Sequence, residues 1–138
     1  MYLVQLIYAS KLNRDNMSEG SVAKIAESSA ANNKVKNITG VLYSDGEHFL
    51  QTMEGGRTAV SQLFSKISQD KRHENVTILR FQDIFVRDFN DWSMKLLSLT
   101  QDKVELMRRY SIGTQFDPYV LAGESSRSFL LELSRFDR

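Results

Sequence analysis

The stretch that decides the fold is residues 37–54, NITGVLYSDGEHFLQTME. It contains two runs of β-type residues, 37–43 and 47–54, and between them stands Ser44-Asp45-Gly46. An Asp-Gly pair between two such runs is a strong local signal for a hairpin, because both residues tolerate the positive φ angles of a tight turn. We therefore predict two adjacent antiparallel strands here, the second and third of the fold.

Helical spacing flanks this hairpin on both sides. On its N-terminal side, Ser18 is the predicted N-cap of a helix, and the flanking Met17 and Val22 have the spacing of a hydrophobic staple. This helix should end near Asn32-Asn33. On the C-terminal side, Gly55-Gly56 breaks the strand pattern, and a helix is predicted from there to about residue 70.

The remaining segments complete the order of elements. Residues 2–10 are rich in aliphatic and aromatic side chains and predict a buried strand, and 76–84 and 92–97 predict a fourth and a fifth strand. Two further helices are predicted at about 101–111 and 124–136. The fold class is therefore α+β. The order is that of a ferredoxin-like βαββαβ fold with an extra strand, which gives a five-stranded mixed sheet with two helices on one face and two C-terminal helices.

Composition narrows the classes of function. The chain has 138 residues, no cysteine, two histidines and a net charge of +1. The absence of cysteine excludes disulfides, thiolate catalysis and cysteine-built metal sites, and no metal centre is expected. The balanced charge argues against direct nucleic-acid binding, and the apolar runs fall short of the about 20 residues of a membrane span. We expect one compact cytoplasmic protein without a membrane segment.

Gln51 is the residue with the most information about function. In an extended strand its amide points the same way as Phe49 and Met53, toward the interior. A buried amide needs partners for two donors and for an acceptor oxygen. In a ferredoxin-like sheet the first and third strands are neighbours, so Tyr8 should lie beside Gln51. A structural phenol-amide hydrogen bond is the simpler explanation of such a pair.

A cluster of further residues favours a ligand. Asn32 and Asn33 at the end of the first helix, and Arg72 and His73 after the second, were expected to meet over the same part of the sheet. Their side chains can bind the edge of a planar heterocycle. Two isoleucines, Ile25 and Ile67, could cover its faces. Each residue taken alone has an ordinary role in a helix core, a helix cap or a loop, so the prediction depends on the cluster.

The chain resembles a known family, the BLUF domains, which sense blue light using flavin. The resemblance covers about residues 1–98. Its motifs are LIYAS (6–10), ITGVL (38–42), FLQ (49–51), MEG (53–55) and WSM (92–94), together with Asn33, Asp70, Arg72-His73 and Phe89. The tail, 99–138, resembles the two-helix extension of the short PixD-type members. The predicted division is a photosensor domain over 1–98 and an extension over 99–138 that packs on the sheet or on a partner.

The resemblance implies roles for individual residues. Tyr8 is implied as the electron and proton donor and Gln51 as the switching amide, and Trp92 and Met94 match two residues near that amide whose inward or outward placement is disputed within the family. The implied contacts to the flavin ring and to its sugar-alcohol chain come from a larger set, namely Asn32, Asn33, Asp70, Arg72 and His73. FAD is the implied cofactor, although FMN and riboflavin remain open because the chain has no G-x-G-x-x-G phosphate loop.

The implied function is a blue-light photoreceptor that is not an enzyme. Excitation drives proton-coupled electron transfer from Tyr8 and rearranges the hydrogen bonds of Gln51, and the fifth strand and C-terminal helices signal to a separate partner protein. A homo-oligomer is also expected. The alternative is a light-independent small-molecule-binding regulatory module of the same fold. An RNA-binding domain is less consistent with the nearly balanced charge of the chain. A hydrolase using His48 and Glu54 is also less consistent with the sequence, because these two residues are interpreted as solvated rim residues.

Overall fold

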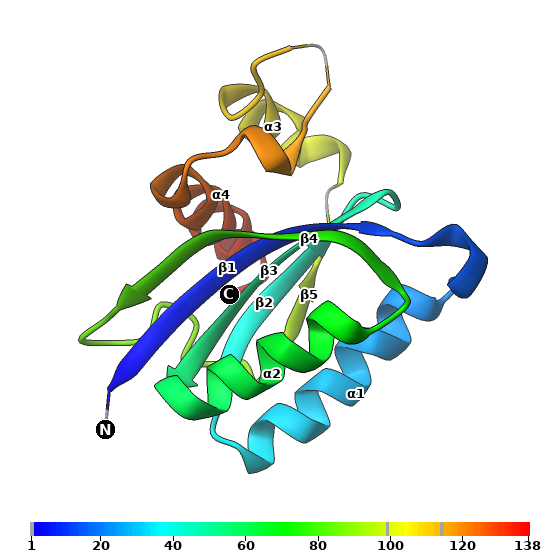
Figure 1. Ribbon diagram of the computed structural model, residues 1–138. Coiled ribbons are helices and arrows are strands. Elements are labelled where there is room, and N and C mark those ends of the chain that lie inside the picture. The colour runs from blue at the N-terminus through cyan, green and yellow to red at the C-terminus, as the bar shows by residue number, and fades with distance from the viewer. Residues whose placement is uncertain (1, 99, 114) are drawn as a thin grey trace.

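The structure is a computed structural model that describes residues 2–98, 100–113 and 115–138. A five-stranded sheet in the order β4-β1-β3-β2-β5 separates two layers of helices (Figure 1). The strands are β1 (Leu3–Leu12), β2 (Thr39–Ser44), β3 (His48–Gly56), β4 (His73–Asp83) and β5 (Lys95–Leu97). Only β5 runs parallel to its neighbour, so the sheet is mixed, as predicted.

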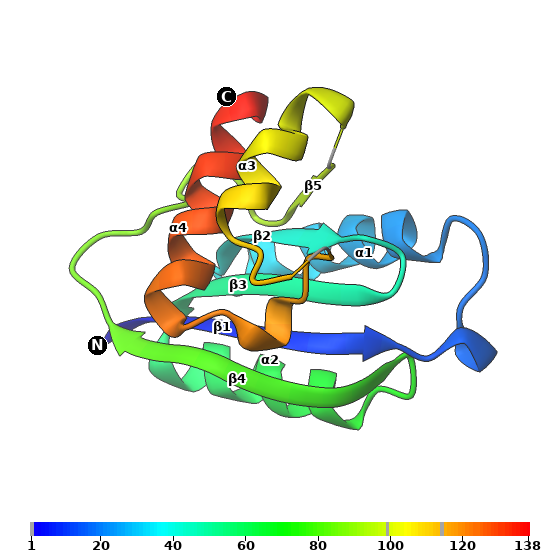
Figure 2. The same cartoon turned by 90° about the horizontal axis from the view of Figure 1, so that it is seen from above.

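Two helices cover each face of the sheet. Helices α1 (Ser21–Val35) and α2 (Arg57–Gln69) lie on one face, and α3 (Val104–Arg109) and α4 (Gly123–Ser134) lie on the other (Figures 1 and 2). Because helices cover both faces, the seven residues Val4–Ser10 of the central strand β1 are all buried. The α+β, ferredoxin-like class with an added strand and two C-terminal helices is confirmed.

The central hairpin forms as its sequence predicts. β2 and β3 pair antiparallel from Thr39↔Glu54 to Ser44↔Phe49. Gly46 has φ of 88°, and the Asp45 carboxylate accepts the backbone N–H groups of Glu47 and His48 at 2.9 and 2.7 Å. The turn thus satisfies its own backbone donors, which explains why an Asp-Gly pair was sufficient to locate it.

Several predicted boundaries were wrong. The N-cap of α1 is Gly20, in the left-handed region with φ of 82°, and not Ser18, whose backbone N–H instead donates to the Ser21 hydroxyl. The helix also continues past Asn32-Asn33 to Val35. β5 lacks the first three residues predicted for it, because the chain makes a turn at Trp92, whose N–H donates to the Phe89 carbonyl and whose own carbonyl accepts from Gly40.

The core consists of three apolar clusters. The largest lies between the sheet and the C-terminal helices and contains Ile7, Tyr43, Phe129 and Leu130, among others. The other two lie under α2 and under α1. The largest cluster joins residues from both sides of residue 98, and the division into domains 1–98 and 99–138 stays a prediction. Residues 1, 99 and 114 lie outside the described residues.

Gly40 makes a close backbone contact that sets a testable limit on the hairpin. A Cβ at this position would lie 1.9 Å from the Thr52 carbonyl oxygen, whereas a Cβ at Gly113 would meet nothing within 4 Å. Gly40→Ala should therefore lower the free energy of unfolding by roughly 2 kcal/mol or more, because β2 and β3 must separate. Urea denaturation measures this loss, and Gly113→Ala is the matched control. Equal stabilities of the two variants would contradict the prediction.

Candidate functional site

Tyr8 and Gln51 lie side by side on β1 and β3, as predicted. They are directly opposite each other in the β1–β3 pairing, and the Tyr8 hydroxyl donates a hydrogen bond to Gln51 Oε1. Their exposed fractions are 0% and 4%. Burial, helped by the negative charge of Asp70, raises the pKa of the Tyr8 hydroxyl, so this group keeps its proton at neutral pH.

The other end of the Gln51 amide faces Met94. Gln51 Nε2 donates to the Met94 sulfur at 3.5 Å, and a thioether is a weak acceptor. Met94 packs with the cluster under α1, whereas Trp92 packs against the cluster under the C-terminal helices. The structure therefore places Met94, and not Trp92, next to the amide.

Asn33 has a buried acceptor atom that has no partner. Its side chain is 1% exposed, and its Nδ2 donates to the Ser93 carbonyl at 3.0 Å. Within the described part of the chain, the carbonyl oxygen Oδ1 has no hydrogen-bond partner. Leaving such an atom unsatisfied costs roughly 1–3 kcal/mol, so Oδ1 suits a ligand that brings a donor. Asn32, by contrast, is exposed.

His73, Arg72 and Asp70 follow α2. The Arg72 guanidinium pairs with the Asp70 carboxylate at 2.5 Å, and its hydrogen bond holds the pKa of Asp70 below the usual range. His73 Nδ1 lies 2.9 Å from the Ser10 hydroxyl, and its ring contacts those of Phe49 and Tyr8 with centroids 4.6 and 6.1 Å apart. Burial lowers the pKa of His73 to about 4.

The expectation that the ends of the two helices meet over one part of the sheet was wrong. Asn33 lies near Ile38, where β2 begins, while Arg72 lies at the far end of β1, next to Asn13. The cause is the topology. Each helix returns along the strand that precedes it, and because β1 and β3 are antiparallel, α1 and α2 run in opposite directions (Figure 1).

A row of contacts nevertheless links these residues across the sheet. His73 contacts Tyr8, Tyr8 bonds to Gln51, and Gln51 bonds to Met94. Asn33 binds the carbonyl of the residue before Met94. The predicted polar groups therefore approach the Tyr8–Gln51 pair from two sides.

Ile25 and Ile67 lie on the two helices that flank this row. Ile25 of α1 packs with Phe49 and Met94, and Ile67 of α2 packs with the cluster that contains Tyr8. They are the predicted apolar covers of a planar ring.

Sequence reasoning missed some residues of the site and misplaced one. Phe64 of α2 contacts the Tyr8 ring at 5.9 Å between centroids, and Ser10 is the partner of His73. Ser10 could have been found from the period of two in β1, since it shares a face with Tyr8. Glu54, interpreted as a solvated rim residue, is fully buried. The period of two from Leu50 was the signal for this burial.

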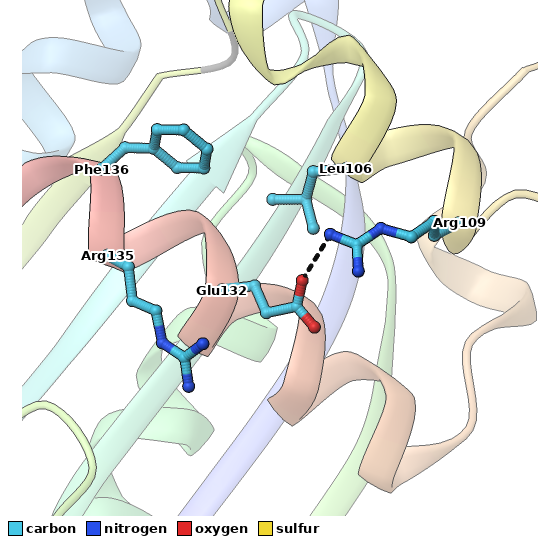
Figure 3. Close-up of a pocket in the computed structure, with 5 residues that line it drawn as sticks. All are labelled: Leu106, Arg109, Glu132, Arg135 and Phe136. Carbon is cyan, nitrogen blue, oxygen red and sulfur yellow. Dashed lines mark hydrogen bonds and ion pairs between the residues drawn. The ribbon is translucent and has the colours of Figure 1, made fainter.

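A separate cleft lies on the other face of the sheet. It opens between α3 and α4, has a volume of about 290 Å³ and is lined by Leu106, Arg109, Glu132, Arg135 and Phe136 (Figure 3). The ion pair between Arg109 and Glu132 crosses it at 2.8 Å. This cleft does not include any residue of the Tyr8–Gln51 row.

Among residues 2–98, 100–113 and 115–138, no helix has the length and apolar character needed to cross a membrane. In the same described part of the chain, no three His, Cys, Asp or Glu residues are grouped so that they could hold a metal ion.

Comparisons with known proteins agree on one family. Residues 3–95 match the family BLUF, "Sensors of blue-light using FAD". The blue light- and temperature-regulated antirepressor BluF of Escherichia coli K12 is 31% identical over 97 residues, which are 70% of this chain and 24% of that protein. Photoactivated adenylate cyclase subunit alpha of Euglena gracilis is 42% identical over 74 residues, 54% of this chain and 7% of that protein.

Solved structures match over almost the whole chain. BlsA in its photo-activated state has a TM-score of 0.84 at 32% identity, covering 95% of this chain and 94% of that one. BlrB, a BLUF protein in its dark state, has a TM-score of 0.80 at 29% identity, covering 99% and 98%. The chain spans a quarter or less of the curated relatives named above. On the family match and on the likeness to solved BLUF structures, this chain belongs to the BLUF family of blue-light sensors that use FAD.

Proposed function

We propose that this chain is a blue-light photoreceptor and that its FAD ring binds between α1 and α2, against the Tyr8–Gln51 pair. The observation that carries the proposal is the buried row from His73 to Met94, with an unpartnered acceptor at Asn33 beside it. When bound, FAD supplies the absorption of blue light and the capacity to accept an electron and a proton from a neighbouring donor. Every other step depends on residues of this chain.

The proposed contacts follow from side-chain chemistry. The free oxygen of Asn33 accepts a hydrogen bond from the ring edge, and Arg72 and His73 hold that edge from the other side. Ile25 and Ile67 cover the two faces. Asp70, which fixes the Arg72 guanidinium, also contacts the sugar-alcohol chain, and Asn32 on the exposed side of α1 makes a weaker contact.

Tyr8 and Gln51 form the proposed switch. The Tyr8 hydroxyl keeps its proton, so it can donate that proton together with an electron. The Gln51 amide has an acceptor at one end and donors at the other, and half a turn exchanges the partners that it can satisfy. In the present arrangement its oxygen faces Tyr8 and its nitrogen faces the weak acceptor Met94. Exchanging these partners changes the free-energy difference between the two orientations of the amide by about 1 kcal/mol or more. This is enough to bias a nearby packing equilibrium.

The proposed output is a change in protein contacts. Met94 and Trp92 stand three residues or fewer before β5 and face opposite sides of the sheet, so they can pass a change at Gln51 to the C-terminal helices. We propose that a separate cytoplasmic protein or a second copy of this chain receives it, and that the chain itself catalyses no reaction.

His73 contributes as a neutral ring. Its lowered pKa means that burial keeps the imidazole uncharged at pH 7, although Asp70 favours and Arg72 opposes protonation. A neutral ring has one donor and one acceptor nitrogen, and the Ser10 hydroxyl occupies Nδ1. Nε2 is then available to the ligand.

Tyr8→Phe should retain flavin but lose the light-induced red shift, because the phenol that supplies the proton is gone. Light-minus-dark absorbance of the purified holoprotein measures this. Tyr2→Phe, an exposed site at 62%, is the control and should behave as the parent. An undiminished photocycle in Tyr8→Phe would remove Tyr8 as the donor.

Gln51→Leu should abolish the red shift while the yellow colour persists, because no amide remains to change partners. Gln62→Leu, on the exposed side of α2, makes the same chemical change away from the site and should leave the shift intact. A normal shift in Gln51→Leu would exclude the proposed switch.

Asn33→Leu should weaken flavin binding by roughly tenfold. One buried hydrogen bond to the ring contributes about 1.4 kcal/mol, which corresponds to a tenfold change in the dissociation constant. Fluorescence titration of the unfolded-and-refolded apoprotein with FAD gives the dissociation constant. Asn32→Leu should weaken flavin binding less. If the two variants lost equal affinity, the free Asn33 oxygen would not be a flavin contact.

Acid should destabilise the fold through His73. In the unfolded chain this ring takes up a proton near pH 6.5, whereas in the folded protein it stays neutral down to about pH 4. The unfolding free energy should therefore fall as the pH drops from 6.5 toward 4, by at most about 1.4 kcal/mol per pH unit from this residue. Urea titrations of the parent and His73→Gln at several pH values test this, with His48→Gln as the control. A parental slope in His73→Gln would contradict it.

A further inference from the structure

The β4–β5 loop, residues 84–94, connects the two faces of the sheet. It leaves the outer strand β4, passes α4 and ends at Met94, which contacts the Gln51 amide (Figure 2). The loop touches the C-terminal segment at two places, and it hydrogen-bonds to the sheet through Arg87, Asp88, Phe89 and Trp92, among others. The directional geometry of these hydrogen bonds fixes position as well as distance.

One of the contacts with the sheet is made by Glu54 of β3. This fully buried carboxylate accepts the backbone N–H groups of Asp88 and Phe89 at 2.8 and 3.0 Å. It also accepts from Gln5 at 2.9 Å and from Thr39 at 3.1 Å. Burial raises its pKa, while these hydrogen bonds oppose the rise. Four donors on one carboxylate anchor the middle of the loop to the sheet.

The first contact with the C-terminal segment joins Asp88 to α4. The Arg127 guanidinium donates two hydrogen bonds to the Asp88 carboxylate, at 2.8 and 3.0 Å. The Asp88 side chain is only 15% exposed. Gln5 donates a hydrogen bond at 2.7 Å to Asp88 Oδ2, the oxygen that also accepts from Arg127 Nε. A two-pronged, mostly buried pair of this kind fixes orientation in a way that an exposed ion pair does not.

The second contact is made by Arg138. Its guanidinium donates to the Asp91 carboxylate and to the Asp88 carbonyl, both at 3.0 Å. The same group lies over the Trp92 ring, 4.8 Å from the ring centre. Arg138 thus holds the loop two residues before Met94, and cation–π attraction adds to its hydrogen bonds.

We propose that Arg127 and Arg138 are positioning residues for the photoreaction, which hold the β4–β5 loop so that Met94 stays against the Gln51 amide. The contacts of these two arginines act on one loop, which Glu54 anchors to the sheet. The docking of α4 and the hydrogen-bond state of Gln51 are therefore coupled. Coupling of this kind is reciprocal: a change at Gln51 loosens or tightens α4, and a change at α4 alters how long the switched amide persists. The inference rests on the proposed photoreceptor function and names the contacts that regulate it.

The test uses the flavin-loaded full chain carrying Arg127→Gln together with Arg138→Gln. The rate of dark recovery after a blue pulse should change by about fivefold or more, the lower range of allosteric couplings. Hydrogen exchange of the α4 amides should also lose its difference between dark and light. Arg108→Gln removes an exposed pair with Glu105 on α3, away from the loop, and should leave both measurements at parental values. Arg127→Lys keeps the charge but not the two-pronged geometry. When it replaces Arg127→Gln in the double variant, both measurements should lie closer to the parental values.

The outcomes separate a positioning role from a merely structural one. Lower thermal stability of the double variant with parental recovery and parental exchange differences would overturn the inference. A parent protein that shows a red shift, together with an unchanged double variant, would overturn the inference alone. A parent without any light-induced shift would instead overturn the proposed function, and the inference with it. If the double variant loses its fold, the single variant Arg138→Gln should still change the recovery rate, and an unchanged rate there counts against the proposal.

Discussion

The hydrogen bond between the Tyr8 hydroxyl and the Gln51 amide oxygen depends on one constraint, the antiparallel register of β1 against β3. That register places the two residues directly opposite each other, and burial on both faces of the sheet removes competing water. A slip of one residue would turn Gln51 toward the C-terminal helices and away from α1 and α2. The proposed flavin site, the contact with Met94 and the link to the β4–β5 loop all follow from this single alignment.

Much of the fold could be predicted because its signals are local. The Asp45-Gly46 turn, the buried run of β1 and the helical spacing of α2 depend on neighbours in sequence, and the structure confirms them. The boundaries that failed depend on tertiary contacts. Ser18 has the right side chain for an N-cap, but the chain forms its cap at Gly20, and β5 is shortened by the turn in which the Trp92 N–H donates to the Phe89 carbonyl.

The positions of the candidate site residues could be predicted only in part. Tyr8 and Gln51 could be paired from topology, because strand order alone sets their neighbourhood. The direction of α1 relative to α2 followed from the same topology, yet the residues at their ends were expected on one side. The choice between Met94 and Trp92 depends on how an irregular loop crosses the sheet, for which no sequence period exists. The burial of Glu54, by contrast, had a signal in the period of two of β3. Family resemblance supplied the chemistry that spacing could not.

The short pairing of β5 has a consequence for how such a protein can respond. β5 meets β2 through three residue pairs, in contrast to nine between β1 and β3. Detaching a strand costs less when fewer backbone bonds and less apolar area are lost, so resistance to local unfolding falls from the middle of the sheet toward this edge. The strand next to Met94 should therefore fray at a lower cost in free energy than the strands at the middle of the sheet.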